Sequence, residues 1–264
     1  MNVPRCLTIA GSDSGGGAGI QADLKAFAAS GCFGMTAIVA LTAQNTTGVT
    51  AVHELPPEFV SAQLEAVFSD LGVDVAKTGM LFSAPIIETV ADFLREHPVP
   101  LVVDPVMVAS SGAKLLRDDA VGVLVTRLFP LATVVTPNLE EAKALAGSDH
   151  EGRDELAERL HALGAAAVIV TGGHGARAVD HLFDGHEHVE IPVSPHDVAA
   201  THGAGCTHSA TLAALLARGL SLQEAARGAA EAASAAVEHG LFELGAGEGP
   251  VDVFKLRREA VRAG

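Results

Sequence analysis

Short apolar runs alternate with longer helical stretches along most of this chain, and this alternation constrains the fold more than any other feature. The predicted strands are Cys6–Ala10, Phe33–Leu41, Asp74–Lys77, Leu101–Val103, Thr133–Thr136 and Ala167–Thr171. The predicted helices are Ala18–Ser30, Pro57–Leu71, Ala84–Arg95, Asp118–Leu128, Leu139–Ala146 and Glu151–Leu163. Repeated switching between the two periods is typical of an α/β fold, in which a central, mostly parallel sheet carries helices on both faces.

The last third of the chain has a different pattern. Two apolar runs flank a turn at Asp184-Gly185 and predict a hairpin, and two Ala-rich helices follow; the four segments are Ala178–Phe183, His186–Pro192, Gly203–Ala217 and Ser221–His239. The 264 residues contain no internal repeat and no linker-like segment. We therefore expect one domain over residues 1–264.

The charge balance excludes several classes of partner. The chain has 17 basic and 32 acidic residues, a net charge of −15, and neither Trp nor Tyr. Such a chain repels nucleic acid and anionic membranes and lacks the aromatic surface on which bases stack. Any phosphate that it binds needs a local device.

The expected location is the cytoplasm. Three widely spaced cysteines, Cys6, Cys32 and Cys206, form neither a disulfide framework nor a zinc motif and suit a reducing compartment. The first ten residues are too short and too polar for a signal peptide, and no apolar run is long enough to span a bilayer.

The segment Thr201–Thr207 is the strongest candidate for a phosphate site. Gly203, Ala204 and Gly205 lead into a long helix, so their backbone N–H groups can approach an anion that the helix dipole also favours. Cys206 falls in the first turn, where a lowered thiol pKa would let it take a proton from a hydroxyl. The alternative is a tight helix start with a small structural cysteine.

Acidic residues follow two other predicted strands. Asp104 ends an apolar strand, where it can attract Mg²⁺ or simply terminate the strand. Asn138 and Glu141 can hold a Mg²⁺-bound water or a phosphate, but their spacing is also that of a helix capping box. Without other evidence the capping box is the stronger interpretation.

Three further features are weak by themselves. The Gly-rich stretch from Gly11 to Gly19 lacks the Gly-Lys-Ser/Thr ending of a P-loop and indicates only close backbone packing. The Gln44 amide suits the ring nitrogen and amino group of an aminopyrimidine, although a surface glutamine is the simpler interpretation. The histidines at 174, 181, 186, 188, 196, 202 and 208 match no zinc pattern and are expected in solvated loops.

Several segments together resemble one family, the hydroxymethylpyrimidine/phosphomethylpyrimidine kinases. The matching segments run in order from residue 7 to about residue 254 and include Leu7–Asp23, Thr42–Thr46, Ala76–Met80, Val103–Met107, Thr136–Asn138 and Thr201–Thr207. Each segment is weak alone, but the ordered set is specific.

This resemblance implies a ribokinase-like fold, ATP and Mg²⁺, a homodimer and a place in thiamin diphosphate synthesis. It implies that Gln44 reads the pyrimidine while Gly11, Asp23 and Met80 shape its pocket. Cys206 would be the base, and Gly203, Ala204 and Gly205 the anion hole. The nucleotide contacts would be Asn138, Thr171 and Gly173, and the metal contacts Asp104 and Glu141.

The chain departs from the family pattern at three positions. It has Thr171 where Lys is frequent, Ala204 where Thr is usual, and Ala200 where Asn is usual. These departures affect the details of phosphate binding and leave the fold expectation unchanged. The alternatives are a pyridoxal or pyridoxine kinase of the same fold, or a pyrimidine-binding protein without catalytic activity.

Overall fold

The computed structural model describes residues 3–109, 111–149, 152–172, 178–196, 198 and 200–256, and all strands in this part belong to one sheet. The strand order is β3-β2-β1-β4-β5-β6-β7-β8-β9. The bounds are β1 (Arg5–Asp13), β2 (Phe33–Asn45), β3 (Gly48–Glu54), β4 (Val75–Thr78), β5 (Leu101–Val103), β6 (Val134–Val135), β7 (Val168–Val170), β8 (Val179–Phe183) and β9 (His188–Pro192). The strands from β2 to β7 in this order are parallel, and antiparallel strands extend the sheet at both ends.

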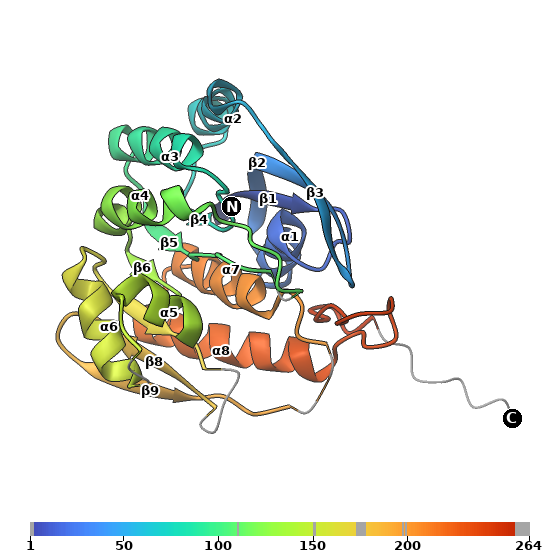
Figure 1. Cartoon of the computed structure of the whole chain (residues 1–264). Coiled ribbons are helices and arrows are strands. Elements are labelled where there is room, and N and C mark those ends of the chain that lie inside the picture. The colour runs from blue at the N-terminus through green and yellow to red at the C-terminus, as the bar shows by residue number, and fades with distance from the viewer. Residues whose placement is uncertain are drawn as a thin grey trace, which may run out of the picture.

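Helices cover both faces of the sheet (Figure 1). One face carries α2 (Pro57–Asp70), α3 (Ala84–Glu96), α4 (Asp118–Leu128), α5 (Leu139–Ala146) and α6 (Arg153–Ala162), with a short 3-10 helix at Phe129–Leu131. The other face carries α1 (Gly19–Ala29), α7 (Ala204–Ala217) and α8 (Leu222–Glu238). Alternate strand residues serve the two cores, since Val75 belongs to the second and Ala76 to the first. The predicted α/β fold is confirmed.

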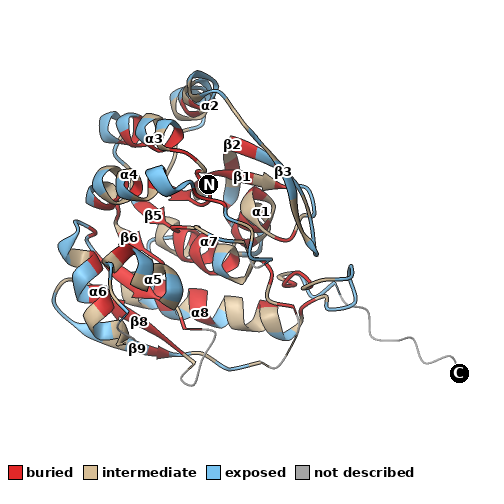
Figure 2. Cartoon of the chain, viewed as in Figure 1, coloured by how far each residue is buried: buried red, intermediate tan, exposed pale blue. Residues whose placement is uncertain are grey.

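Helix α7 is the most enclosed helix (Figure 2). Its residues from Thr207 to Ala214 are all buried, because α7 packs against the sheet, α1 and α8. Small residues make this enclosure possible: α7 is rich in Ala, Ser and Thr, and α8 buries Ala225, Ala226, Ala229 and Ala230. The start of α7 is thereby fixed against the ends of the central strands.

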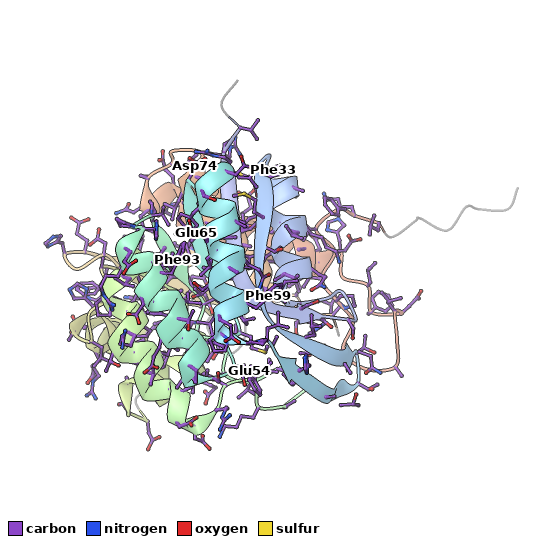
Figure 3. The ribbon with its side chains drawn as sticks, turned by 90° about the horizontal axis from the view of Figure 1, so that it is seen from above. Phe33, Glu54, Phe59, Glu65, Asp74 and Phe93 are labelled. Atoms are coloured by element: carbon purple, nitrogen blue, oxygen red, sulfur yellow. The ribbon has the colours of Figure 1, made fainter. Side chains whose placement is uncertain are left out.

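On the opposite face, α2, α3 and α4 lie side by side (Figure 3). Phe93 of α3 packs edge-on against Phe68 of α2, with ring centroids 5.1 Å apart. Phe59 on α2 is 55% exposed. This face supports the sheet, and its core contains Met80 of the predicted site residues, while Asn138 and Glu141 lie at the start of α5.

The predicted strands and α-helices agree closely with the structure, with one omission, and the short 3-10 helix at Phe129–Leu131 was also not predicted. The bounds of β5, α4 and α5 are those predicted, and the hairpin of β8 and β9 is confirmed, with Gly185 at φ +90° in its turn. The missed element is β3, an edge strand without a single buried residue, which therefore has no apolar alternation. Within the described residues, no helix is long and apolar enough to cross a membrane.

Candidate active site

The start of α7 lies at the carboxyl ends of the central parallel strands. Helix α7 contacts β1, β4 and β5. Strand β1 runs into the Gly-rich stretch, and Asp104 follows β5 directly. Ligands of open parallel sheets bind at this edge, so the residues gathered here form the candidate site.

A buried lysine joins three elements at this edge. The Lys77 side chain in β4 has no exposed surface, and its Nζ lies 2.9 and 3.0 Å from the carboxylate oxygens of Asp23 in α1. The same Nζ lies 3.7 Å from Asp104 Oδ2, to which Ser209 of α7 donates a hydrogen bond of 2.8 Å. Burial alone would lower the pKa of Lys77, but Asp23 and the other acidic groups nearby raise it above its ordinary value. The site therefore contains a fixed positive charge.

Asp23 is enclosed by this network. Its side chain is fully buried, and it accepts hydrogen bonds from Lys77 and, at 2.6 Å, from Thr8 Oγ1. Because Asp23 has no exposed surface, it cannot contact substrate directly. It shapes the pocket by fixing the position of Lys77.

Cys206 lies in the first turn of α7, as predicted, but the expected lowering of its thiol pKa is wrong. Burial raises the pKa of the thiol to about 12, and the charges of Asp23 and Asp104 raise it further. Lys77 and the backbone N–H of Gly19 act in the opposite direction but do not outweigh these effects. The helix position predicts a thiolate, whereas burial, and after it the carboxylates of other elements, keep the thiol protonated in the free protein.

The N-terminus of α7 has no side-chain cap and no acidic residue in its first turn. Gly203 precedes the helix at φ +87°, and a Cβ there would lie 1.9 Å from the Gly17 carbonyl oxygen, so only glycine fits. In the described part of the chain, the N–H groups of Gly205 and Cys206 have no hydrogen-bond partner, whereas Ala204 N–H donates to Thr201. Gly205 is exposed, and a Cβ on it would meet nothing within 4 Å. Open donors facing open space are what an anion requires.

The Gly-rich stretch after β1 is organised by Asp13, which sequence reasoning missed. Its carboxylate accepts hydrogen bonds from the backbone N–H groups of Gly15, Gly17 and Ala18 at 2.7, 3.0 and 2.9 Å. The fourth contact is His202 Nε2, 3.1 Å away. Burial would raise the pKa of Asp13, but the hydrogen bonds from His202 and the backbone outweigh it and lower the pKa. The only sequence signal for this role of Asp13 is its position two residues before a run of glycines.

The residues expected around the pyrimidine fall into two contacting groups. Gly11 N–H donates to the Met80 carbonyl at 3.1 Å, and a Cβ on Gly11 would lie 2.3 Å from Met80 Cε. Gln44 lies at the end of β2, where its carbonyl accepts a hydrogen bond of 2.7 Å from Ser14. Thr42 Oγ1 donates to Gln44 Oε1 at 3.1 Å, which fixes the amide orientation. Both groups border the Gly-rich stretch.

The start of α5 is a capping box, which confirms the structural interpretation of Asn138 and Glu141. Asn138 Oδ1 accepts from Glu141 N–H at 2.9 Å, and Glu141 Oε2 accepts from Asn138 N–H at 3.0 Å. The second Glu141 oxygen accepts from Met107 N–H at 3.3 Å. Burial, followed by the charge of Asp104, raises the pKa of Glu141 to about 8.

The Asp104 and Glu141 pair fits a divalent cation. The charge of Asp104 raises the pKa of Glu141, and a cation beside the two side chains would favour the ionised form of Glu141. Within the described residues, no three His, Cys, Asp or Glu side chains come together as metal ligands. A cation here would complete its shell with water and phosphate oxygens, which suits Mg²⁺.

The nucleotide residues are partly described. Thr171 pairs with Asn138 in a parallel bridge, and its N–H donates to the Pro137 carbonyl at 2.9 Å. The structure thus brings two of the three expected nucleotide residues together. Gly173, like His174, lies outside the described residues.

The expectation of solvated histidines is wrong for three of them. His181, His202 and His208 are buried, and the latter two lie 3.1 Å from Asp13 and Asp180 respectively. His202 is hydrogen-bonded to its carboxylate, whereas His208 is close to its carboxylate without a hydrogen bond. Both carboxylates are distant from the histidines in the sequence, so local patterns do not indicate this burial.

Comparisons with known proteins identify the family. The sequence profile described as phosphomethylpyrimidine kinase matches residues 13–252. The chain belongs to the phosphomethylpyrimidine kinase family. It is 51% identical to the hydroxymethylpyrimidine/phosphomethylpyrimidine kinase of Rhizobium meliloti, over 94% of this chain and 96% of that protein.

Two further relatives extend this family assignment. The chain is 52% identical to the thiamine biosynthesis bifunctional protein ThiED of Geobacter sulfurreducens, over 97% of this chain and about half (53%) of that protein. The crystal structure of an ADP complex of Bacillus subtilis pyridoxal kinase superimposes with a TM-score of 0.89 at 40% identity, covering 98% of this chain and all (100%) of that one. The resemblance found in the sequence and the ribokinase-like fold that it implied are confirmed.

Proposed function

We propose that this protein is a kinase that transfers phosphate from ATP to the hydroxymethyl group of 4-amino-5-hydroxymethyl-2-methylpyrimidine, and then to the resulting phosphate, in thiamin diphosphate synthesis. Membership in the phosphomethylpyrimidine kinase family supports the substrate. The observation that carries the chemistry is the uncapped start of α7, where open N–H donors lie beside Lys77 and Cys206.

The chain's own residues divide the work of phosphoryl transfer. The N–H groups of Gly205 and Cys206 hold the transferring phosphoryl group, and Lys77 offsets part of its charge. Gln44 reads the ring, while Gly11 and Met80 shape its pocket. On the nucleotide side, Asn138, Thr171 and Gly173 contact ATP.

Asp104 and Glu141 would hold Mg²⁺ through its water shell, and the ion would neutralise charge on the ATP phosphates. Lys77 and the Gly19 N–H both favour the thiolate form of Cys206. That thiolate acts as base and takes the proton of the hydroxymethyl oxygen in the first step. In the second step the acceptor is already anionic and needs no base.

We further propose that the chain is one domain, that it works as a cytoplasmic homodimer, and that neither nucleic acid nor membrane is a partner. The single sheet supports the first point, and the net charge of −15 supports the last.

A pyridoxal kinase is the nearest alternative, because the Bacillus subtilis pyridoxal kinase has the same fold at 40% identity. A pyrimidine-binding protein without activity is the alternative from another class, and the open anion site at Gly205 argues against it.

The deciding experiment is ATP turnover by the purified protein with hydroxymethylpyrimidine and, separately, with pyridoxal, with products followed by mass. We expect mono- and then diphosphorylated pyrimidine. Phosphorylation of pyridoxal alone would move the assignment to vitamin B6, and the absence of both products would favour the binding protein.

A further inference from the structure

We propose that His202 and Asp13 are a positioning pair that holds the Gly-rich stretch against the start of α7 and keeps water away from the transferring phosphoryl group. The proposal rests on the proposed function, because it takes the Gly-rich stretch as the pyrimidine side and α7 as the phosphoryl side of the site.

The first argument is that both partners are buried and fully engaged. The two side chains are 10% and 3% exposed, and His202 Nε2 lies 3.1 Å from Asp13 Oδ2. The same carboxylate accepts the three backbone N–H groups that define the Gly-rich stretch. Asp13 therefore connects the conformation of the pyrimidine side directly to the residue that precedes Gly203.

The second argument is the backbone contact that the pair maintains. A Cβ on Gly17 would lie 2.3 Å from His202 Cδ2, and a Cβ on Gly203 would lie 1.9 Å from the Gly17 carbonyl oxygen. The two segments touch so closely that no water fits between them at this point. Removing the imidazole would open a space beside the anion site.

The third argument is that His202 is fixed from a third side. Its N–H donates to the Gly249 carbonyl at 3.2 Å, and its carbonyl accepts from Val251 N–H at 3.1 Å. A side chain whose backbone is held in place can set the separation of the two segments, whereas one on a loose loop would only follow them.

Two outcomes compete once ATP is bound. The bond between the γ-phosphorus and the ADP oxygen breaks, and a new bond forms either to the pyrimidine hydroxymethyl oxygen or to a water oxygen; in both cases the attacking oxygen loses its proton. A held acceptor and excluded water favour transfer over hydrolysis. The pair should therefore control the ratio of ADP released to pyrimidine phosphate formed.

The chain offers a control of similar burial. His208 Nε2 also lies 3.1 Å from a carboxylate, Asp180 Oδ2, and these side chains are 6% and 4% exposed, but the contact lacks hydrogen-bond geometry. This second pair joins α7 to β8 and touches neither the Gly-rich stretch nor Gly203. Its loss should destabilise the protein without opening the site to water.

The experiment compares the wild type with His202→Ala, His202→Gln, Asp13→Asn and His208→Ala. ADP and pyrimidine phosphate are measured separately, ATP hydrolysis is measured without any acceptor, and thermal unfolding reports stability. We expect His202→Ala to form pyrimidine phosphate about 100-fold more slowly, the cost of a misplacement of about 1 Å. We also expect it to release more than one ADP per product and to hydrolyse ATP faster than the wild type without acceptor. His202→Gln, whose amide can reach Asp13, should restore most of the coupling.

His208→Ala should lower the unfolding temperature and keep one ADP per product. If His202→Ala, or Asp13→Asn where the alanine variant does not fold, keeps that ratio and shows wild-type hydrolysis without acceptor, the pair has only a structural role and the proposal is wrong. Failure of the proposed function would be seen in a different measurement: the wild-type protein would make no pyrimidine phosphate. The acceptor-free hydrolysis still tests the pair in that case.

Discussion

The helices α5 and α7 both begin at the carboxyl edge of the sheet, yet their N-termini are built in opposite ways. The start of α5 satisfies its own donors, since Asn138 and Glu141 cap each other's backbone. The start of α7 has glycine at the cap position and no side chain that reaches its donors. One terminus is complete without a ligand, and the other is left open for one.

The charges at the two helix N-termini differ as well. The first turn of α5 contains Glu140 and Glu141, whereas the first turn of α7 has no acidic residue. An acidic helix start near Asp104 suits a cation, and an uncapped start near Lys77 suits an anion. Together they provide the two charges that a metal-bound phosphate needs, although the protein as a whole is strongly acidic.

The largest effect is expected from closing the open terminus with Gly203→Ala. Alanine at φ +87° is strained by about 1–3 kcal/mol, and its Cβ would displace the Gly17 backbone. Product formation should fall by at least about 100-fold, since the anion donors move. Steady-state kinetics and thermal unfolding measure the two effects.

Gly205→Ala is the matched control for that change. Its Cβ meets no protein atom, so the helix should gain about 1 kcal/mol of stability while the Cβ intrudes on the bound anion. Full activity in the stabilised Gly205→Ala protein would show that no ligand approaches this face.

The next largest effect concerns the thiol at the open terminus. Cys206→Ala should slow the first phosphorylation by about 100-fold, as the loss of a general base does, and the second by less than about tenfold. Separate assays with hydroxymethylpyrimidine and its monophosphate measure the two steps. The control is Cys32, which is buried in the core beside α1. Its replacement, Cys32→Ala, should leave the ratio of the two rates unchanged. Equal losses in both steps would remove Cys206 from the role of base.

The thiol also shows where sequence reasoning stops. Local patterns predicted nearly all elements, the Cys206 position in the first turn and the capping box at Asn138, because each depends on neighbouring residues. The sign of the Cys206 pKa shift was wrong because the burial that raises it, and the lesser effects of Asp23 and Asp104, depend on other elements. The buried partners Asp13 and His202 were missed for the same reason, and β3 was missed because an exposed edge strand has no apolar period.

A smaller effect concerns the start of α5, where the stability of the protein should depend on pH through Glu141. The pKa of Glu141 is about 8 in the folded protein, against an ordinary value of 4.5. Between these values the unfolded chain releases a proton that the folded chain keeps, so stability falls as pH rises from about 5 to 8, by roughly 3 to 4 kcal/mol. Thermal unfolding from pH 5 to 9 measures this slope, and Glu141→Gln should flatten it.

Added Mg²⁺ sharpens the same test, because a cation at Asp104 and Glu141 favours the ionised form. We expect Mg²⁺ to bind more tightly as pH approaches 8 and to reduce the slope in the wild type. A Glu141→Gln protein that binds Mg²⁺ as tightly as the wild type at every pH would exclude Glu141 from the metal site.

The smallest effect separates the two roles of Asn138, as helix cap and as nucleotide contact. Asn138→Ala should cost about 1 kcal/mol of stability, the usual contribution of an N-cap. Ser221→Ala removes an equivalent capping box at the start of α8 and should cost a similar amount. Only Asn138→Ala should also raise the KM for ATP, by about fivefold, which corresponds to one hydrogen bond. An unchanged KM would mean that α5 begins with a cap and nothing more, and that the nucleotide is held from the Thr171 side alone.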